Sequence, residues 1–261
     1  MSQPAVAVAI PAYNERDGIV DFIMEIDEAL ASQPHATFVV VDDCSTDGTP
    51  EALEEARGKL RAELVVVRSP RNQGHGPTLL EAYRRALDTG AGFVVAVDGD
   101  GQFLGADIRR ILVLLQDGGD GACGVRRFRY DPWFRMAMTR LLRLYVSTSF
   151  GVPTRDANCP LRGYRAELLD ELLSWVPDRS LIPNLHLTVL AARRGVTLVE
   201  VDVNHRVRRG AQDGGTMFTG GNGWQTARRL VTFSWHAFAE SRRYRHDLNS
   251  GRRPLPSAGR S

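Results

Sequence analysis

Short apolar runs and amphipathic stretches alternate along the first 125 residues of the chain. The apolar runs lie at about 5–10, 37–42, 63–68, 93–97 and 120–125. The stretches between them have helical spacing, at about 16–32, 48–58, 75–90 and 105–117, and the first of them carries one apolar face made of Ile19, Phe22, Ile23, Ile26 and Leu30. Strands that alternate with helices indicate βαβ units. We therefore expect an α/β fold with a mostly parallel central sheet and helices on both faces.

The alternation stops beyond residue 125. Helical patterns recur at about 131–150, 166–174 and 184–194, and one further strand is expected at 197–203. A single long helix is predicted at 222–244, because helical spacing relates Trp224, Ala227, Val231, Trp235 and Phe238. The tail from about residue 246 contains Gly, Pro, Ser and Arg without apolar periodicity, which predicts disorder.

Length and composition are those of an ordinary globular domain. The chain has 261 residues, of which 43% are hydrophobic and 25% charged, and this allows a large core. No apolar run approaches the roughly eighteen residues of a membrane span, and the first residues lack the basic and apolar regions of a secretory signal. The three cysteines show no CxxC spacing, so we expect a cytoplasmic protein with reduced thiols and without a zinc site.

The net charge of +2 hides a strong asymmetry. Residues 1–120 hold 10 Lys and Arg against 20 Asp and Glu, a net charge of −10, whereas residues 121–261 hold 23 against 11, a net charge of +12. A basic C-terminal half indicates an anionic partner such as a phosphate or an acidic membrane surface. A solvated arginine-rich surface is the simpler alternative. Nucleic acid is a poor candidate, because the arginines surround glycines and amphipathic helices without an aromatic platform for bases.

An acidic turn, Asp98 to Gln102, follows the apolar run at 93–97. Two carboxylates separated by one residue at the end of a strand suit a hard divalent cation, which prefers oxygen ligands and can share them with phosphates. The glycines of this turn let the backbone approach a ligand closely. An ordinary acidic, glycine-rich turn is the alternative interpretation.

Polar clusters follow the three earlier strands as well. They span residues 11–15, 42–49 and 71–76. In a parallel sheet, ligands bind beyond the carboxyl ends of the strands, so these clusters are candidate ligand loops. Each also has a plain structural interpretation, with Asp47 or Thr49 as a helix cap and Gly74 in a tight turn. No GxGxxG follows the first strand, which argues against a dinucleotide fold.

Together these motifs resemble the family 2 inverting glycosyltransferases, which have a GT-A fold. The resemblance rests on the segments Ile10 to Glu15, Val41 to Thr49, Asn72 to Gly76 and Asp98 to Gln102. Two later segments, 156–165 and 205–216, look more loosely like the acceptor half of the polyprenyl-phosphate sugar synthases, the dolichyl-phosphate mannose synthase group. The chain would then consist of a donor-binding half at 1–125, an acceptor-binding half at 126–218, an amphipathic helix at 219–245 and a tail at 246–261.

The resemblance implies a nucleotide-sugar donor and a divalent cation. The base and ribose would be contacted by Pro11, Tyr13, Glu15, Asp42 and Asp43, with Gly74 also on the donor side. Mg²⁺ or Mn²⁺ on the diphosphate would be held by Asp98, Asp100 and Gln102, and Asp98 would also support the ribose. The basic loop after the last strand would close over the diphosphate through Arg206, Arg208 and Arg209.

The resemblance also implies an acceptor phosphate site. Arg126, and Arg135 with Thr139, occupy the matching places, and the catalytic candidates are Asp100, Asp156, Arg126 and Arg208. Two features depart from the synthase pattern. Asp213 stands in the basic loop where a small hydroxyl residue is common, and the C-terminal transmembrane helices of some relatives have no match.

The chemistry of the acceptor separates the possible functions. A phosphate monoester is ionised near neutral pH and needs no general base, whereas a sugar hydroxyl needs one. Asp156 is the best candidate for such a base, although an Asx-turn or an arginine partner would explain it equally well. We predict a glycosyltransferase that moves a hexose of mannose or glucose type from a GDP- or UDP-sugar to polyprenyl phosphate, peripherally bound to the inner face of the membrane.

Two alternatives to this function stay open. One keeps the donor chemistry but uses a soluble hydroxyl acceptor with Asp156 as base. The other is a nucleotide-sugar-binding protein without turnover. The helix predicted at 222–244 has an apolar aromatic face flanked by arginines, which suits an anionic membrane surface or a membrane-bound partner. Packing of that helix on the protein's own core is equally consistent with the pattern.

Overall fold

The computed structural model describes residues 5–126, 133–207 and 223–251, and for 133–139, 223–227 and 229–231 the backbone alone. Seven strands form one sheet: β1 Val6–Ala12, β2 Ala36–Asp42, β3 Glu63–Arg68, β4 Phe93–Ala96, β5 Gly121–Arg126, β6 Arg162–Arg165 and β7 Val199–Val203. Their order is β3-β2-β1-β4-β6-β5-β7. Only β6 runs antiparallel to its neighbours, and the other pairs are parallel. The predicted mostly parallel α/β sheet is confirmed.

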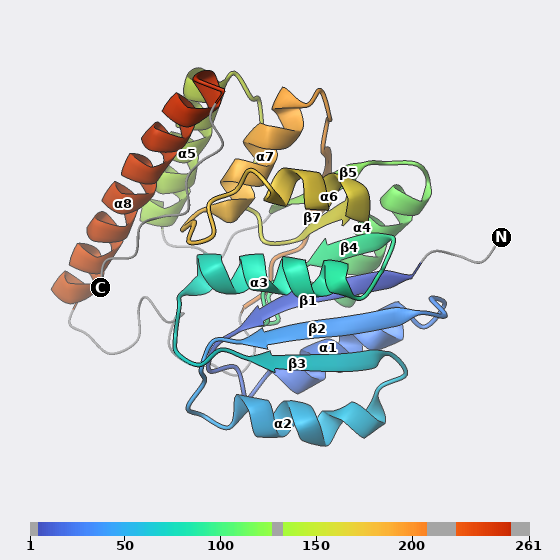
Figure 1. Ribbon diagram of the computed structural model, residues 1–261. Helices are drawn as coiled ribbons and strands as arrows, with labels where there is room; N and C mark the ends of the chain where they lie inside the picture. Colours follow the sequence, from blue (N-terminus) through green and yellow to red (C-terminus); the bar gives the residue numbers. More distant parts are fainter. Residues whose placement is uncertain (1–4, 127–132, 208–222, 252–261) are drawn as a thin grey trace.

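The helices pack on both faces of this sheet (Figure 1). They are α1 Ile19–Ala29, α2 Thr49–Ala56, α3 His75–Asp88, α4 Gly105–Gln116, α5 Trp133–Phe150, α6 Ala166–Leu173, α7 Pro183–Arg193 and α8 Gly223–Asn249, with a short 3-10 helix at Arg57–Lys59. One core joins α1, α2 and α4 to the sheet, and a second joins α3, α6 and α7 to the opposite face. The five apolar residues predicted on one face of α1 are all buried in the first core.

Helices α5 and α8 lie beside each other at one end of the sheet (Figure 1). The ring centroids of Tyr145 on α5 and Phe238 on α8 are 5.2 Å apart. A third apolar cluster joins these two helices to α7. Helix α8 continues to Asn249, past the boundary expected at residue 245. Among the described residues, no helix has the length and apolarity that a membrane crossing requires.

Strand β6 was missed by the sequence patterns. Its four residues, Arg162 to Arg165, contain two arginines and a glycine and no apolar run. The strand exists because it is paired on both sides, with β4 and with β5. Gly163 is needed there, since a Cβ at this position would overlap Ile111 of α4.

The strand register brings the polar clusters to one edge of the sheet. Ala12, Asp42 and Arg68 are paired across β1, β2 and β3, so these three strands end together. The chain beyond β4 stays beside β1, because Gly99 donates its N–H to the carbonyl of Pro11 at 3.2 Å. Strand β5 points the same way as β4, since both are antiparallel to β6. The polar loops therefore lie at the carboxyl edge of the sheet, where ligands bind in folds of this type.

Candidate active site

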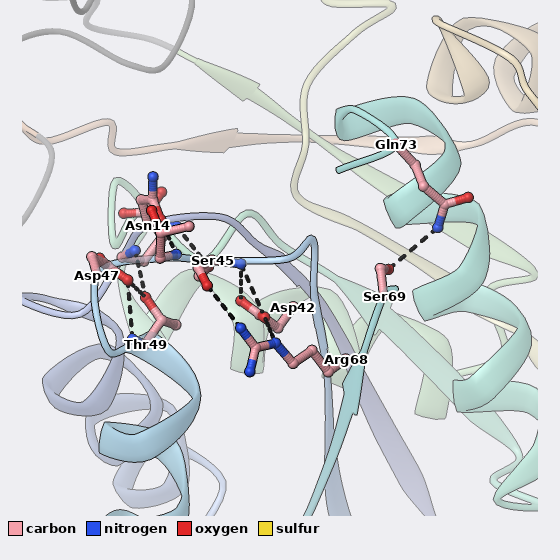
Figure 2. Close-up of polar contacts among 10 residues, drawn as sticks. Asn14, Asp42, Ser45, Asp47, Thr49, Arg68, Ser69 and Gln73 are labelled. Carbon is pink, nitrogen blue, oxygen red and sulfur yellow. Dashed lines mark hydrogen bonds and ion pairs between the residues drawn. The ribbon is translucent and has the colours of Figure 1, made fainter. Parts of the chain in front are cut away.

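The loops after β1 and β2 hold each other (Figure 2). Asn14 donates its N–H to Ser45 Oγ at 2.9 Å, and Thr46 donates its N–H to Asn14 Oδ1 at 2.9 Å. Asn14 has a φ of 53°, a left-handed conformation that asparagine tolerates better than most residues. The two loops therefore form one rigid unit.

A second set of contacts fixes Glu15 in the same unit. Glu15 donates its N–H to Thr49 Oγ1 at 2.9 Å, and this hydroxyl donates to Asp47 Oδ1 at 2.6 Å. Asp47 also accepts the N–H of Thr49 at 3.0 Å. The N-cap of α2 is Gly48, however, and no side chain caps it, so the predicted cap at Asp47 or Thr49 is wrong. Burial opposes the ionisation of Asp47, but hydrogen bonds from Thr49 and Arg16 outweigh it and lower the pKa of this carboxyl.

Asp42 and Asp43 were predicted to contact the base or ribose of the donor, and the structure gives each of them a protein partner. The fully buried carboxylate of Asp42 accepts the N–H of Ser45 at 3.1 Å and lies 3.6 Å from Nε of Arg68. Arg68 in turn donates to the carbonyl of Ser45 at 3.0 Å (Figure 2). Asp42 and Arg68 thus contact each other and both hold the backbone of the loop after β2.

Asp43 clamps the loop that follows β3. Its Oδ1 accepts the N–H of Gln73 at 2.7 Å, and its Oδ2 accepts the N–H of Gly74 at 2.9 Å. Gly74 has a φ of 86° and precedes α3, so glycine is favoured at this turn. The N–H of Gly74 is already bonded to Asp43, so any contact between this turn and a nucleotide sugar would use other atoms. The predicted contact of Gly74 with the nucleotide sugar stays a prediction.

The acidic turn lies beside these loops, next to β1. A Cβ at Gly99 would lie 3.1 Å from the carbonyl oxygen of Pro11, so the turn packs closely against the end of β1. Asp100 Oδ1 accepts the N–H of Gln102 at 3.1 Å. The Gln102 side chain donates to the carbonyl of Arg206 at 3.5 Å, which joins the turn to the segment after β7.

The environment of Asp98 indicates whether the acidic turn suits a divalent cation. Its Oδ1 is buried and accepts no hydrogen bond from the part of the chain that the structure describes. His75 Nε2 lies 3.7 Å from this oxygen. A buried carboxylate oxygen that lacks a donor fits a hard cation. Within the described residues, no group of three His, Cys, Asp or Glu could hold a metal alone. A cation held by one or two carboxylates shares its remaining positions with water or phosphate oxygens.

Arg206 forms part of the frame of the acidic turn. Its guanidinium donates to the carbonyl of Gly101 at 2.6 Å and to Glu25 Oε2 of α1 at 2.8 Å. Glu25 Oε1 also accepts the N–H of Gly105 at the start of α4, at 2.8 Å. The contact predicted between Arg206 and a diphosphate stays a prediction. Beside Arg206, the buried His205 packs edge-to-face on Phe103 with 5.7 Å between ring centroids.

Arg126 and Asp156 form a bidentate pair at the end of β5. Nε of Arg126 donates to Asp156 Oδ2 at 2.8 Å, and an Nη donates to Oδ1 at 3.0 Å. The side chains are 16% and 3% exposed, so solvent screens this pair weakly. Both oxygens of Asp156 therefore serve an arginine, which was one of the two simpler explanations of this residue.

The loop that carries Asp156 is built around a fully buried arginine that sequence reasoning did not single out. Arg162 donates to the carbonyls of Ala157 and Cys159 at 2.6 and 2.8 Å, and to Thr188 Oγ1 at 2.8 Å. Burial alone would lower the pKa of Arg162, but its neighbours, led by Tyr164, raise it above the ordinary value. Arg162 therefore stays charged and holds the loop in shape.

Several predicted positions stand apart from these contacts. The side chains of Arg135 and Thr139, and the whole of Arg208, Arg209 and Asp213, lie outside the described residues. Pro11 is buried in β1, and Tyr13 is half-buried just after it. The residues that sequence reasoning missed are Glu25, Ser45, Arg68 and Arg162. Their only sequence signal is polarity. The partners of Glu25 and Arg68 are distant in the chain, whereas Ser45 and Arg162 also bond to near neighbours in irregular loops.

The site combines two acidic residues in a turn with loops that are held by hydrogen bonds at the ends of parallel strands. The ion pair of Arg126 and Asp156 lies at the end of β5 on the same edge of the sheet. A family model, "Glycosyl transferase family 2", matches residues 7–173. The chain belongs to glycosyl transferase family 2. The predicted family is confirmed, and with it the prediction that the chain belongs to the glycosyltransferase enzymes.

Curated relatives of this family 2 member are undecaprenyl-phosphate 4-deoxy-4-formamido-L-arabinose transferases. The relative from Aeromonas hydrophila is 29% identical over 205 residues, covering 78% of this chain and 60% of its own length. The one from Proteus mirabilis is 28% identical over 204 residues, with the same two coverages. The chain thus spans about 60% of the length of these relatives.

Solved structures share the fold of this family 2 chain. Glucosyl-3-phosphoglycerate synthase from Mycobacterium tuberculosis, in complex with Mn²⁺, UDP and glucosyl-3-phosphoglycerate, has a TM-score of 0.64 at 17% identity, covering 97% of this chain and 82% of that one. A mannosyltransferase from Pyrobaculum calidifontis, in complex with GDP-Man and Mn²⁺, has a TM-score of 0.61 at 22% identity, covering 92% and 65%. The predicted GT-A fold is confirmed by these neighbours.

Proposed function

We propose that this chain is a metal-dependent inverting glycosyltransferase that moves a hexose of mannose or glucose type from a GDP- or UDP-sugar to a polyprenyl phosphate at the cytoplasmic face of the membrane. The observation that carries the proposal is the buried Oδ1 of Asp98, which lacks a hydrogen-bond donor among the described residues. The names of relatives and neighbours support it: undecaprenyl phosphate appears in the former, and UDP, GDP-Man and Mn²⁺ in the latter.

The donor would lie along the carboxyl ends of β1, β2 and β4. Asp98 and Asp100 would hold Mg²⁺ or Mn²⁺ on the diphosphate, with Gln102 beside them. When bound, the cation supplies charge stabilisation for the diphosphate as it leaves. The clamped loops at Glu15 and Asp43 would hold the nucleoside, because loops fixed by their own hydrogen bonds need little ordering when a ligand binds.

The Arg126–Asp156 pair favours a phosphate acceptor over a hydroxyl acceptor. Asp156 has both oxygens engaged by Arg126, so it serves first as the partner that holds the guanidinium. A hydroxyl acceptor would require this carboxylate to take up a proton. A polyprenyl phosphate carries its own ionised nucleophile, and a guanidinium at the end of β5 would attract it.

Helices α5 and α8 would place the enzyme on an anionic lipid surface. The exposed fractions of Leu141 and Leu144 on α5 are 63% and 61%, and that of Trp235 on α8 is 69%. The same two helices carry exposed arginines at positions 140, 143, 228, 242 and 243. Apolar side chains flanked by arginines match a membrane interface with acidic headgroups.

A donor panel tests the proposed transfer. GDP-mannose, UDP-glucose and a UDP-linked L-arabinose derivative are each given with Mn²⁺ or Mg²⁺ and undecaprenyl phosphate, and labelled sugar is followed into the organic phase. We expect transfer from one donor, and its loss when the metal is chelated. The absence of organic-phase label from every donor would refute the proposed acceptor.

Asp156→Asn separates the two acceptor classes. If Asp156 only holds Arg126, the variant keeps one acceptor oxygen, and we expect the rate to fall by roughly tenfold. If Asp156 were a general base, turnover would nearly vanish while donor binding stayed intact. A near-complete loss of that kind would point to a hydroxyl acceptor.

Vesicle flotation tests the lipid surface. We expect binding to vesicles of acidic phospholipid, weaker binding to neutral vesicles, and weakening by Trp235→Ser. His236→Ser, at an exposed neighbouring position on α8, is the matched control. Equal binding of both variants and the wild type would contradict a role for Trp235 at the membrane.

A further inference from the structure

One peptide unit, Ser180–Leu181, lies between helix α8 and the first turn of α3. Its N–H belongs to Leu181 and its carbonyl to Ser180, in the loop that precedes α7. The two ends of this unit contact different helices. Because a peptide unit is planar and rigid, a force on one end is felt at the other.

The N–H end is held by Glu240 of α8. The two oxygens of Glu240 lie 3.2 and 3.0 Å from the Leu181 nitrogen, and Oε1 also accepts the Ser180 hydroxyl at 2.7 Å. The Ser180 hydroxyl lies 3.0 Å from His186 Nδ1 as well. The Glu240 side chain is 18% exposed, so these contacts are mostly shielded from water.

The carbonyl end lies against Gly76 of α3. A Cβ at Gly76 would overlap the carbonyl oxygen of Ser180 and would lie 3.1 Å from Leu181 Cα. Only glycine lets the first turn of α3 approach this closely. The Ser180–Leu181 peptide is thus the surface on which that turn rests.

The same turn holds one side of the candidate donor site. Gln73 and Gly74 donate their N–H groups to Asp43, and His75 lies 3.7 Å from Asp98. We propose that Glu240 is a positioning residue: through the Ser180–Leu181 peptide it sets the place of the turn at 73–76, and so makes donor binding depend on the seating of helix α8. This inference rests on the proposed nucleotide-sugar donor for its ligand, but its geometry does not.

Two readouts on the full chain test this coupling. The first is amide hydrogen exchange of peptides that span residues 71–80, measured without ligand. The second is the Kd of UDP and of GDP with Mn²⁺, measured by calorimetry. For Glu240→Ala we expect faster exchange at 71–80 and about three- to tenfold weaker nucleotide binding, which corresponds to the net contribution of one ordinary hydrogen bond. The KM for undecaprenyl phosphate should stay within about twofold.

Three variants complete the design. Glu240→Gln keeps one carbonyl oxygen for the Leu181 N–H, so its exchange at 71–80 and its nucleotide affinity should stay close to those of the wild type. Gly76→Ala pushes the same peptide from the other side and should weaken nucleotide binding at least as much as Glu240→Ala. Glu171→Gln removes an exposed carboxylate that pairs with Arg194 on the protein surface, and it should change neither readout.

The two readouts show separately whether the positioning role of Glu240 fails and whether the proposed donor chemistry fails. Exchange at 71–80 and a nucleotide Kd in Glu240→Ala that match those of Glu171→Gln would overturn the positioning role. Faster exchange spread evenly over the whole chain would also overturn it, because that pattern reports general loosening. If the wild type binds neither nucleotide, the proposed donor chemistry fails, and hydrogen exchange still decides the coupling by itself.

Discussion

Arg206 and Glu25 lie 181 positions apart in the chain, and their side chains are paired at 2.8 Å. The pair joins the segment after β7, the last strand of the sheet, to α1. Its other contacts reach the carbonyl of Gly101, within the acidic turn, and the N–H of Gly105, three residues after the turn ends. The acidic turn is therefore held by residues from both ends of the chain.

Replacing Glu25 by Ala should loosen this frame. The change removes the partner of Arg206 and leaves the N–H of Gly105 without its acceptor, so we expect a loss of about 1–3 kcal/mol in the free energy of unfolding. Urea unfolding followed by circular dichroism measures it. Glu28→Ala, which removes an exposed carboxylate on the same helix, is the control and should cost less than about 1 kcal/mol. Equal costs for the two variants would contradict the framing role of Glu25.

Asp43→Asn should weaken donor binding more than it weakens the fold. The amide of Asn keeps one acceptor oxygen but turns its NH₂ toward one of the two donors, Gln73 or Gly74. We expect roughly tenfold weaker binding of UDP or GDP with Mn²⁺, in line with the loss of one charge-assisted hydrogen bond. Calorimetry measures the affinity, and the exposed Asp117→Asn is the control. Unchanged affinity in the Asp43 variant would separate this clamp from the donor site.

Asp98→Asn should separate metal binding from stability. Because Asp98 Oδ1 accepts no hydrogen bond from the described residues, its removal leaves no described donor unsatisfied, and the unfolding free energy without metal should change by less than about 1 kcal/mol. Loss of the charge should abolish the gain in nucleotide affinity that Mn²⁺ provides. Titration of nucleotide with and without Mn²⁺ measures this difference. A variant that kept the full Mn²⁺ effect would exclude Asp98 as a ligand.

Stability should fall on acidification because of His186. Burial lowers the pKa of His186 to about 3, against an ordinary value of 6.5. Below pH 6.5 the unfolded chain takes up a proton that the folded imidazole refuses. The contribution of His186 to stability is therefore complete above pH 6.5 and declines toward pH 3, by up to about 1.4 kcal/mol per pH unit.

His186→Phe tests this pH dependence. The variant keeps a ring against Tyr244, which stacks on His186 with 3.9 Å between centroids, but it cannot titrate. We expect a flatter curve of unfolding free energy against pH between 6.5 and 4. Glu240 acts in the opposite sense, since burial raises the pKa of its carboxyl and acid then favours its folded form. Only the difference between wild type and variant therefore isolates His186, and parallel curves would contradict its role.

The sequence determined the type of fold and the positions of the polar loops at the carboxyl edge of the sheet. Alternating apolar runs and helical patterns depend on neighbouring residues, and they located every strand of the sheet except β6 to within a few residues. The motif from Asp98 to Gln102 was recognisable because its residue types and spacing are local. The same holds for Asp47, whose contact with Thr49 spans two residues.

The tertiary structure alone decided what the polar residues of these loops bind. Strand β6 has no apolar pattern and forms because two neighbours pair with it. Asp43 holds a turn that lies 31 residues further along the chain, at Gly74. Glu240 reaches the Ser180–Leu181 peptide across about 60 residues. Each of these contacts depends on where the sheet and helices bring distant segments together, and no local pattern of residues encodes that distance.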